Sequence, residues 1–356
     1  MSPAQPYAHL HTNPNGPNDA RPTALQIIAD ESLTNALPGT TIVLTGATSG
    51  IGLETARALL TTGATLYLPV RNLESATTAL SALLLSENGP HINLVEMDIS
   101  SLSSVKSAAA EILRLSGGKI NILIANAGMM GLAELTVSAD GYEMHFAVNY
   151  LGHFYLFQLL KGALLSSASL GKASRVVVVS SSAARAARLD RDAEGDGDGE
   201  GEDGYAYDYD YNFTRGTYDM QTAYSRAKLA SVYMASSIEH RYGSRNLHAT
   251  SLHPGGIDTA ISRHVGRGFV DNLMSNPAIA RIVKSPEQGA ATTVWAAVGV
   301  EWEGRGGRYL EDCGEAGEGV DDGDVFGVGF VGRMYDFDTG EGVWRGMCAL
   351  LGVKDE

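Results

Sequence analysis

The stretch Thr41-Ile42-Val43-Leu44-Thr45-Gly46-Ala47-Thr48-Ser49-Gly50-Ile51-Gly52 decides the fold of this chain. A short apolar, β-branched run passes into a glycine cluster, and a helical pattern begins at about residue 50. Glycines let the chain turn sharply and let a pyrophosphate approach the backbone, while the N-terminus of the next helix offers free N–H groups to phosphates. A tight turn without a ligand is the alternative, because the spacing is Gly-x-x-x-Gly-x-Gly rather than Gly-x-Gly-x-x-Gly. The position between a strand and a helix favours nucleotide binding.

Apolar runs and helical patterns alternate along the rest of the chain. Further strands are expected at residues 65–70, 92–97, 120–125, 176–179, 246–252 and 308–310. Helices are expected at residues 23–37, 50–62, 74–85, 105–115, 141–165 and around residue 224. This alternation predicts a single α/β domain, with a doubly wound parallel sheet of the Rossmann type and helices on both faces. We expect this domain at residues 23–351, with a flexible tail at 1–22 and a short C-terminal tail at 352–356.

The composition excludes several classes of protein. The 356-residue chain carries a net charge of −15, which argues against nucleic acid or an anionic membrane surface as a partner. The two cysteines, Cys313 and Cys348, form neither a metal-ligand spacing nor a disulfide framework, and no bound metal is expected. No apolar stretch is long enough to span a bilayer, and the N-terminus lacks a basic-then-apolar leader. We therefore expect a soluble, cytoplasmic protein.

The residues that follow the second and third expected strands bear on the choice of cofactor. NAD-binding sheets commonly place an acid after the second strand to hold the ribose 2′-hydroxyl, but Pro69-Val70-Arg71-Asn72 contains none. Arg71 can pair with a 2′-phosphate, so NADP is expected rather than NAD; an ordinary solvated arginine is the alternative. Asp98 could accept a hydrogen bond from the adenine amino group, or it could cap the next helix, as could Ser100.

The catalytic candidates lie in Ala223-Tyr224-Ser225-Arg226-Ala227-Lys228-Leu229-Ala230. Tyr224 and Lys228 are four residues apart, which places both side chains on one face of a helix. A phenol has an unperturbed pKa of about 10. A nearby ammonium lowers that pKa toward the range in which acid–base catalysis is efficient. For the pair alone, a helix with a half-buried tyrosine and a solvated lysine is the alternative.

Taken in order, these motifs resemble the single-domain type of short-chain dehydrogenase/reductase. The resemblance covers about residues 23–351 and is closest to the retinol-dehydrogenase-like, WW-domain-oxidoreductase-like and fungal-type members, some of which act in secondary metabolism. The matching segments are Thr45 to Gly52, Arg71-Asn72, Asn126-Ala127-Gly128, Asn149-Tyr150-Leu151-Gly152-His153-Phe154, Ser181, Tyr224-x-x-x-Lys228, Pro254-Gly255 with Ile257 and Thr259, and Gly307-Arg308-Tyr309-Leu310.

The resemblance implies an enzyme, an NADP(H)-dependent oxidoreductase. It would move a hydride between the nicotinamide and a carbonyl or alcohol carbon of a small, apolar or aromatic substrate. Tyr224 would act as the general acid or base, and Lys228 would lower its pKa and bind the nicotinamide ribose. Ser181 would polarise the substrate oxygen, and Asn149 would hold a water that relays the proton. The expected cofactor-binding residues are Gly46, Ser49, Gly50, Ile51, Gly52, Arg71, Asp98, Asn126, Ala127, Gly128, Tyr224, Lys228, Pro254, Gly255, Ile257 and Thr259.

Several alternatives stay open at this point. Ser180 and Ser182 are chemically equivalent to Ser181, and only the resemblance selects among them. Asn149 could instead be a buried amide bonded to the main chain. The histidines near the motifs are interpreted as structural; they are His145, His153 and His253. As a whole, the protein could be a cofactor-binding sensor or scaffold without turnover, or it could perform non-redox chemistry.

Other segments lie outside the shared motifs. An acidic insertion at about 188–215 precedes Tyr224, and between Asp190 and Asp210 it holds ten acidic residues and one basic residue. We expect a loop that either covers the pocket or has no role. Residues 256–285 are expected to form a substrate lid, 314–332 a loop, and 341–351 a packing helix. Relatives often pair through the tyrosine-bearing helix, so a homo-oligomer is possible here, but the acidic insertion just before that helix could interfere, and the oligomeric state stays open. The apolar residues expected in the lid are Phe269, Leu273, Met274 and Ile279.

Overall fold

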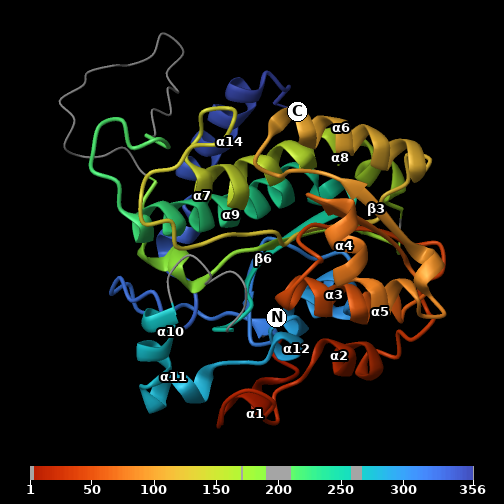
Figure 1. Cartoon of the computed structure of the whole chain (residues 1–356), viewed down its shortest axis with the longest axis horizontal. Coiled ribbons are helices and arrows are strands. Elements are labelled where there is room, and N and C mark those ends of the chain that lie inside the picture. Colours follow the sequence, from red (N-terminus) through yellow and green to blue (C-terminus); the bar gives the residue numbers. More distant parts are fainter. Residues whose placement is uncertain (1–3, 170, 190–209, 258–266, 356) are drawn as a thin grey trace.

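The computed structural model describes residues 4–169, 171–189, 210–257 and 267–355, and Figure 1 shows the chain. Within these ranges the chain forms an eight-stranded sheet in the order β3-β2-β1-β4-β5-β6-β7-β8. The strands are β1 Thr41–Leu44, β2 Thr65–Val70, β3 Ile92–Glu96, β4 Ile122–Ala125, β5 Ser174–Val179, β6 Leu247–His253, β7 Arg308–Glu311 and β8 Gly314–Glu315. Strands β1 to β7 are parallel, and β8 runs antiparallel to β7. The predicted doubly wound α/β fold is confirmed, and only β8 was not predicted.

The order of the strands positions the site. Strand β1 lies between β2 and β4, so the direction of chain progression reverses at the β1/β4 boundary. Every residue of β1, β4 and β5 is buried, because a parallel sheet is covered on both faces. Ligands of open α/β sheets bind outside the carboxyl ends of the strands at such a reversal. The glycine turn that follows β1 and the segment that follows β4 meet there.

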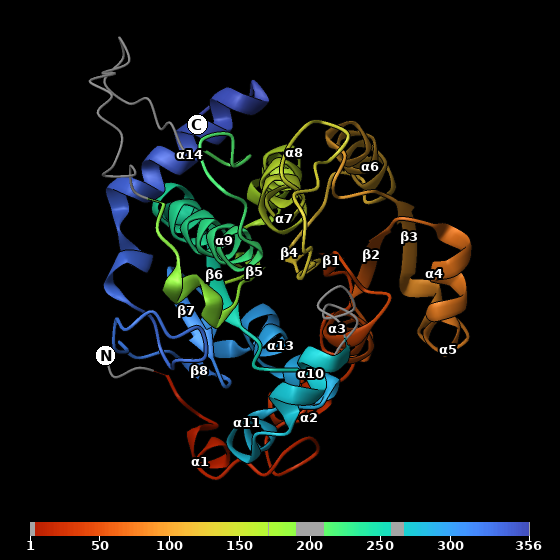
Figure 2. The same cartoon turned by 60° about the vertical axis from the view of Figure 1, so that its left-hand side comes forward.

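Helices cover both faces of the sheet, as Figure 2 shows. The helices are α1 Ala8–His11, α2 Ala24–Asp30, α3 Gly50–Leu60, α4 Leu73–Ala79, α5 Ser81–Leu84, α6 Leu102–Leu115, α7 Met144–Phe146, α8 Gly152–Ser167, α9 Met220–Tyr242, α10 Arg267–Met274, α11 Pro277–Ile282, α12 Pro286–Gly289, α13 Ala291–Val298 and α14 Phe337–Leu351. One face carries α6, α8 and α9, and the other carries α2, α3, α12 and α13. In the described part of the chain, no helix is long and apolar enough to cross a membrane.

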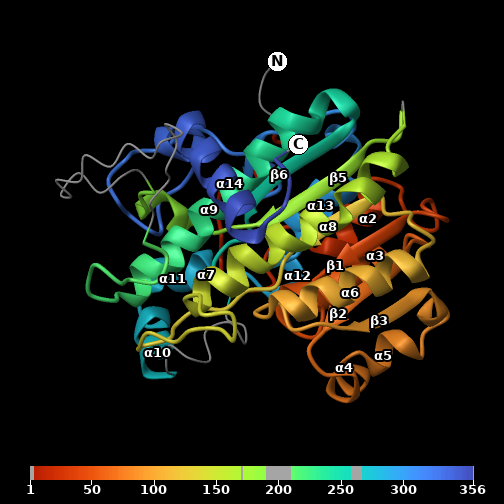
Figure 3. The ribbon, with the colours of Figure 1, turned by 90° about the horizontal axis from the view of Figure 1, so that it is seen from above.

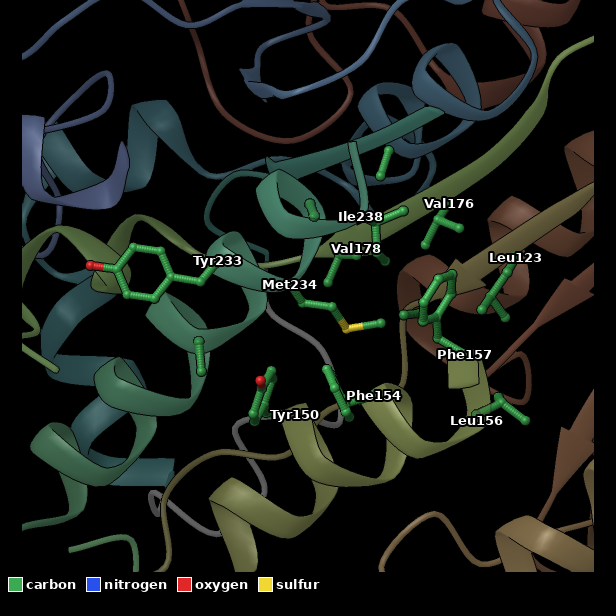
Figure 4. Close-up of a cluster of buried hydrophobic side chains, with 14 of the residues drawn as sticks. Leu123, Tyr150, Phe154, Leu156, Phe157, Val176, Val178, Tyr233, Met234 and Ile238 are labelled. Atoms are coloured by element: carbon green, nitrogen blue, oxygen red, sulfur yellow. The ribbon is translucent and has the colours of Figure 1, made fainter. Parts of the chain in front are cut away.

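The larger hydrophobic core lies between the sheet and helices α8 and α9. Figure 4 shows Phe154 and Phe157 of α8 near Met234 of α9, with Val176 and Val178 of β5 beside them. All five side chains are buried. Burying such a side chain fully stabilises the fold by about 1.5–3 kcal/mol. This core therefore fixes α9, which carries Tyr224 and Lys228, against the strand that leads to Ser181.

The N-terminal residues do not form the expected free tail. The Arg21 side chain is buried and donates hydrogen bonds from Nη1 to the Ile282 carbonyl at 2.7 Å and from Nη2 to the Val283 carbonyl at 2.7 Å. Tyr7 is also buried, and its hydroxyl donates to Asp30 at 3.1 Å. The polar composition of residues 1–22 predicts disorder. The segment has few apolar residues to bury, but the bonds from Arg21 to backbone carbonyls hold it in place. The described residues 4–22 thus form a strap along α11.

Several predicted helices have different bounds in the structure, and the helix expected at 74–85 is divided into α4 and α5. Helix α2 ends at Asp30 rather than at residue 37, because Ser32 and Asn35 have positive φ angles of 56° and 53°, which a helix cannot include. The helix expected from residue 141 begins at Met144, and Ala147–Leu151 forms a π-helical turn before α8. That turn carries Asn149.

The C-terminal residues are also bonded to the body of the protein. Helix α14 lies next to α9 in Figures 2 and 3 and buries Val343, Trp344 and Met347. Asp355, in the expected C-terminal tail, accepts hydrogen bonds from Trp344 Nε1 at 2.8 Å and from Arg241 at 3.1 Å. The described residues of this segment are therefore held on the outer side of α9 rather than free.

Candidate active site

A cavity of about 900 Å³ opens at the carboxyl ends of the strands. It is lined by every predicted site residue that the structure describes, except Asn149. Thr259 lies outside the described residues. Segments that are far apart in the sequence therefore meet in one place, as the strand order requires. Within the described ranges, no group of three His, Cys, Asp or Glu side chains could hold a metal ion.

The glycine turn, which we call the glycine cradle, packs too tightly against neighbouring protein atoms to carry side chains at Gly46 and Gly52. Gly46 has a φ of +72°, and a Cβ atom there would lie 2.8 Å from the Cα of Ala127. A Cβ atom on Gly52 would collide with the carbonyl oxygen of Gly46. Ser49 precedes α3 without making a side-chain capping bond, so that side chain leaves the N–H groups of the first turn to a ligand. This geometry fits the pyrophosphate of a dinucleotide.

The turn is tied to the next strand by side chains. Thr45 Oγ1 accepts hydrogen bonds from the backbone N–H groups of Asn126 and Ala127, each at 2.9 Å. Asn126 Nδ2 donates to the Thr45 carbonyl at 2.8 Å. Since Thr45 Oγ1 already accepts two bonds, its proton points to His153 Nε2 at 2.8 Å. Burial, together with the charge of Lys228, lowers the pKa of His153 to about 3, so the imidazole is neutral and acts as the acceptor.

The adenosine end shows one difference from the sequence analysis. Arg71 is exposed at the edge of the cavity, directly after β2. Asp98 Oδ1 accepts hydrogen bonds from the backbone N–H of Ser100 at 2.9 Å and from its hydroxyl at 2.7 Å. Neither residue caps α6, because Ser101 does so by accepting from the Ser104 N–H. Asp98 is thus fixed at the cavity wall by a local turn.

Tyr224, Lys228 and Ser181 meet at the other end of the cavity. Tyr224 is buried and forms a side-chain hydrogen bond with Ser181. Ser180 Oγ donates to the Lys228 carbonyl at 2.6 Å, and Ser182 Oγ donates to the Val325 carbonyl at 2.6 Å. Of these three serines, Ser181 is therefore the one that the structure places on Tyr224.

Burial dominates the electrostatics of this pair. Lys228 Nζ lies 5.7 Å from the centroid of the Tyr224 ring and donates to the Val179 carbonyl at 2.9 Å. Burial raises the pKa of Tyr224, and the hydrogen bond from Ser181 only partly offsets that effect. Burial also lowers the pKa of Lys228 to about 8. In this structure the net shift of the Tyr224 pKa is thus opposite in direction to the one predicted.

Asn149 differs most from its predicted role. Its side chain is buried outside the cavity, with Oδ1 accepting from the Met129 N–H at 2.9 Å and Nδ2 donating to the Met129 carbonyl at 3.0 Å. Both ends of the amide are therefore bonded to the main chain, which was the alternative interpretation. The carbonyl of Asn149 accepts from Ser231 Oγ at 3.3 Å. His153 Nδ1 lies 3.4 Å from the same carbonyl, so this oxygen has two partners.

The loop after β6 is held by a lysine that the sequence analysis missed. Lys284 Nζ donates to the Pro254 carbonyl at 3.2 Å and pairs with Asp312 at 2.6 Å. Gly255 has a φ of +105°, and a Cβ atom there would lie 2.8 Å from Lys284 Cδ. His11 Nδ1, from the N-terminal strap, lies 3.3 Å from Asp312. No local pattern identifies Lys284, because its partners Pro254 and Asp312 come from two other segments.

Apolar side chains line much of the remaining cavity. Met274 and Ile279 of the expected lid are among them, while Phe269 and Leu273 lie in α10. Val325 and Phe326, from the glycine-rich segment after β8, also line the cavity and were not predicted. The other apolar wall residues include Met129, Met130, Leu132, Met144, Val148, Ile282 and Val283.

Comparisons with known proteins agree with this arrangement. A family model described as short chain dehydrogenase matches residues 40–191. The chain is 42% identical to "Short-chain dehydrogenase/reductase prx1" of Penicillium rubens, over 98% of this chain and 96% of that protein. It is 32% identical to the WW domain-containing oxidoreductase of Pongo abelii, over 83% of this chain and 66% of that protein.

A solved structure shares the fold. The "RhlG/NADP active-site complex" of Pseudomonas aeruginosa superposes with a TM-score of 0.57 and 20% identity, over 78% of this chain and 96% of that chain. The predicted likeness to fungal-type and WW-domain-oxidoreductase-like proteins is confirmed by the two relatives above. With its doubly wound sheet and these relatives, the chain belongs to the short-chain dehydrogenase/reductase family of oxidoreductases.

Proposed function

We propose that this oxidoreductase uses NADP(H) and interconverts a carbonyl group and an alcohol on a small, apolar or aromatic substrate. The observation that carries the proposal is the hydrogen-bonded pair Ser181 and Tyr224, buried beside Lys228 in the cavity that also contains the glycine cradle. The glycine turn fits the cofactor because it leaves the N–H groups at the start of α3 to a pyrophosphate. When bound, NADPH would supply a hydride to the carbonyl carbon.

The residues of this chain would handle the proton and the oxygen. Ser181 would donate a hydrogen bond to the substrate oxygen and so stabilise the negative charge that develops on it. Tyr224 would transfer its proton to that oxygen in reduction and would take it back in oxidation. The raised pKa of Tyr224 keeps the phenol protonated, which is the form that reduction needs.

Lys228 would replace the proton that Tyr224 gives up. One of its three donors is used by the Val179 carbonyl, which leaves two for the cofactor ribose and for a relay. Its pKa of about 8 lets it lose and regain a proton near neutral pH. Asn149, whose amide keeps a second Nδ2 hydrogen beside its bonds to Met129, would hold the relay water. These roles account for the burial of the lysine next to the tyrosine.

NADP rather than NAD is proposed from the residue that follows β2. Arg71 lines the cavity and is exposed, so its guanidinium is available to a 2′-phosphate. The segment Val70-Arg71-Asn72 offers no acid to repel that group, and Asn72 is used instead to cap α4 through the Ser75 N–H at 2.8 Å.

Replacement of Tyr224 by phenylalanine tests the mechanism. Tyr224→Phe removes one hydroxyl and keeps the ring, so we expect turnover to fall by at least a thousandfold while the Kd for NADPH changes less than threefold. NADPH oxidation with a panel of ketones, aldehydes and quinones measures the first quantity, and fluorescence titration measures the second. Turnover that survives in Tyr224→Phe would show that another group supplies the proton. Tyr335→Phe, which removes the hydroxyl of a half-buried tyrosine outside the cavity, is the control.

A further inference from the structure

The glycine- and acid-rich segment 317–331 forms one wall of the cavity mouth. The sequence predicts only a loop here, but Val325 and Phe326 line the cavity. Phe326 is 55% exposed, and Val320 and Val328 in the same segment are 72% and 74% exposed. Large apolar side chains seldom gather on an open loop without a binding role. The segment therefore presents an apolar rim at the entrance to the proposed active site.

One buried arginine holds this segment in place. Arg185 belongs to the short 3-10 turn Ser182–Ala186 that directly follows Ser181, and its side chain is 2% exposed. Its guanidinium donates to four backbone carbonyls of the segment. They are those of Val320 at 2.7 Å, Asp324 at 3.3 Å, Val328 at 2.5 Å and Gly329 at 2.9 Å. A planar guanidinium can serve such a set of acceptors, whereas a lysine ammonium has fewer donors and a different geometry.

Two glycines are fitted to the guanidinium. A Cβ atom on Gly319 would lie 2.5 Å from Arg185 Nη1, and one on Gly327 would lie 2.5 Å from Arg185 Nη2. Neither glycine has a positive φ, so close approach rather than backbone conformation explains their presence. By contrast, Gly317 of the same segment has open space around its Cα. The segment therefore packs its backbone directly against the Arg185 guanidinium.

Further bonds join the segment to the serine turn. Ser182, the neighbour of Ser181, donates from Oγ to the Val325 carbonyl at 2.6 Å. Arg333 donates to the Ala187 carbonyl at 2.9 Å and to the Arg185 carbonyl. Val325 and Phe326 are consequently fixed relative to the hydroxyl that faces Tyr224.

We infer that segment 317–331 selects the substrate and that Arg185 is the residue that positions it. The inference rests on the proposed function and names the substrate more closely. Phe326 and Val325 would contact an uncharged apolar portion, a hydrocarbon chain or an aromatic ring, that extends from the carbonyl group toward solvent. The segment holds four acidic residues and no basic residue, so it disfavours carboxylate-bearing substrates.

A series of straight-chain aldehydes, from butanal to octanal, tests the apolar contact. In Phe326→Ala we expect the KM for octanal to rise about tenfold and the KM values for butanal and NADPH to stay within twofold, because only the longer chain reaches the rim. Val300→Ala, at an exposed valine away from the cavity, is the control and should change none of these values. An equal rise for butanal and octanal, or no rise for either, would overturn the assignment.

Gly327→Ala and Gly317→Ala form a matched pair that tests the role of Arg185. The added methyl group in Gly327→Ala displaces the guanidinium, so the KM for octanal should rise at least tenfold while kcat stays within threefold of the wild-type value. Gly317→Ala should behave like wild type. Arg185→Ala should show the same rise, and ethylguanidinium at millimolar concentration should restore the low KM where ethylammonium does not. If Arg185 had only a structural role, its replacement would lower kcat as well as kcat/KM. Ethylguanidinium would then restore activity no better than ethylammonium.

A measurement without turnover separates this inference from the proposed function. With NADPH present, with which an alcohol cannot react, 1-octanol used as a probe should slow amide hydrogen exchange in residues 317–331 of wild type but not of Phe326→Ala. If no aldehyde is reduced but this protection is seen, the proposed reaction is wrong and the assignment of segment 317–331 to substrate binding is supported. If aldehydes are reduced without any protection or chain-length effect, the wall assignment fails and the reaction stands.

Discussion

At the scale of single residues, the site depends on burying groups that prefer water. Tyr224 and Lys228 are both buried, and burial moves their pKa values in the directions that favour the neutral forms. The fold therefore loses stability in order to hold a lysine beside the tyrosine. That cost is measurable as a dependence of stability on pH.

Lys228→Met should reveal this dependence. The pKa of Lys228 is about 8 in the folded protein, below its ordinary value of 10.5. Below pH 8 Lys228 is protonated in both the folded and the unfolded protein, and the folded protein is destabilised by the buried charge. Between pH 8 and 10.5 the unfolded state binds more protons, so the stability of wild type relative to Lys228→Met should rise by about 3 kcal/mol. Urea unfolding at several pH values measures this difference. If the difference in stability between wild type and Lys228→Met does not change with pH, as we expect for the exposed control Lys106→Met, the charge of Lys228 is not buried at a cost.

Arg71 carries the proposed preference for NADP. Arg71→Ala removes a charge-assisted bond, worth about 1.5–3 kcal/mol, so the Kd for NADPH should rise roughly tenfold to a hundredfold. The Kd for NADH should change less than threefold, and Arg71→Asp should enlarge the contrast. Fluorescence titration of both cofactors gives these values, with the exposed Arg114→Ala as the control. Equal losses for the two cofactors would remove the argument for NADP.

At the scale of elements, the N-terminal strap supports α11, whose residues Ile279 and Ile282 line the cavity. Arg21 bonds the strap to the carbonyls of Ile282 and Val283, both of which line the cavity. Arg21→Met keeps the bulk of the side chain but leaves these carbonyls without their donor. We expect a loss on the order of 3 kcal/mol in the free energy of unfolding. Amide exchange in residues 277–283 should quicken at least tenfold, whereas the exposed control Arg281→Met should leave it unchanged.

The elements also show which features the sequence can predict. Strands β1 to β7 and the motifs at their carboxyl ends follow from apolar runs and glycines, because both signals are local. Arg21, Arg185 and Lys284 could not be found in this way, since their acceptors are backbone carbonyls of distant segments, and a carbonyl has no sequence signature. Asn149 is bonded to the main chain of Met129, which is one of the two alternatives that the sequence left open.

At the scale of the whole molecule, the surface expected to pair two copies is covered by the chain itself. Trp344 of α14 packs on Phe154 of α8 with ring centroids 4.9 Å apart, and Arg241 of α9 lies over the Trp344 ring at 4.5 Å. Arg241 also forms an ion pair with Glu341 of α14. A partner helix could reach this face of α9 only after α14 had moved away.

We therefore predict that the protein is a monomer. Light scattering coupled to size exclusion should give a mass near 37.6 kDa. Trp344→Ala should destabilise the fold by about 3–5 kcal/mol, because it empties the contact between α14 and α8. A stable dimer with amide protection mapped to α9 would contradict the prediction. Phe337→Ala, at an exposed position of the same helix, is the control and should change neither mass nor stability by more than about 0.5 kcal/mol.

The way in which Arg185 holds segment 317–331 has a consequence for how this enzyme could diverge. The guanidinium is bonded to backbone oxygens, so the bonds do not depend on which side chains the segment carries at positions 325, 326 and 328. The positions fixed by sterics or by backbone conformation are glycines, namely Gly319 and Gly327 beside the guanidinium and Gly323 and Gly329 with positive φ. Mutations could therefore replace the apolar rim freely while the loop keeps its path. A gene duplication would give such a chain an economical route to new substrates, and a randomised library at these three positions would be the laboratory equivalent.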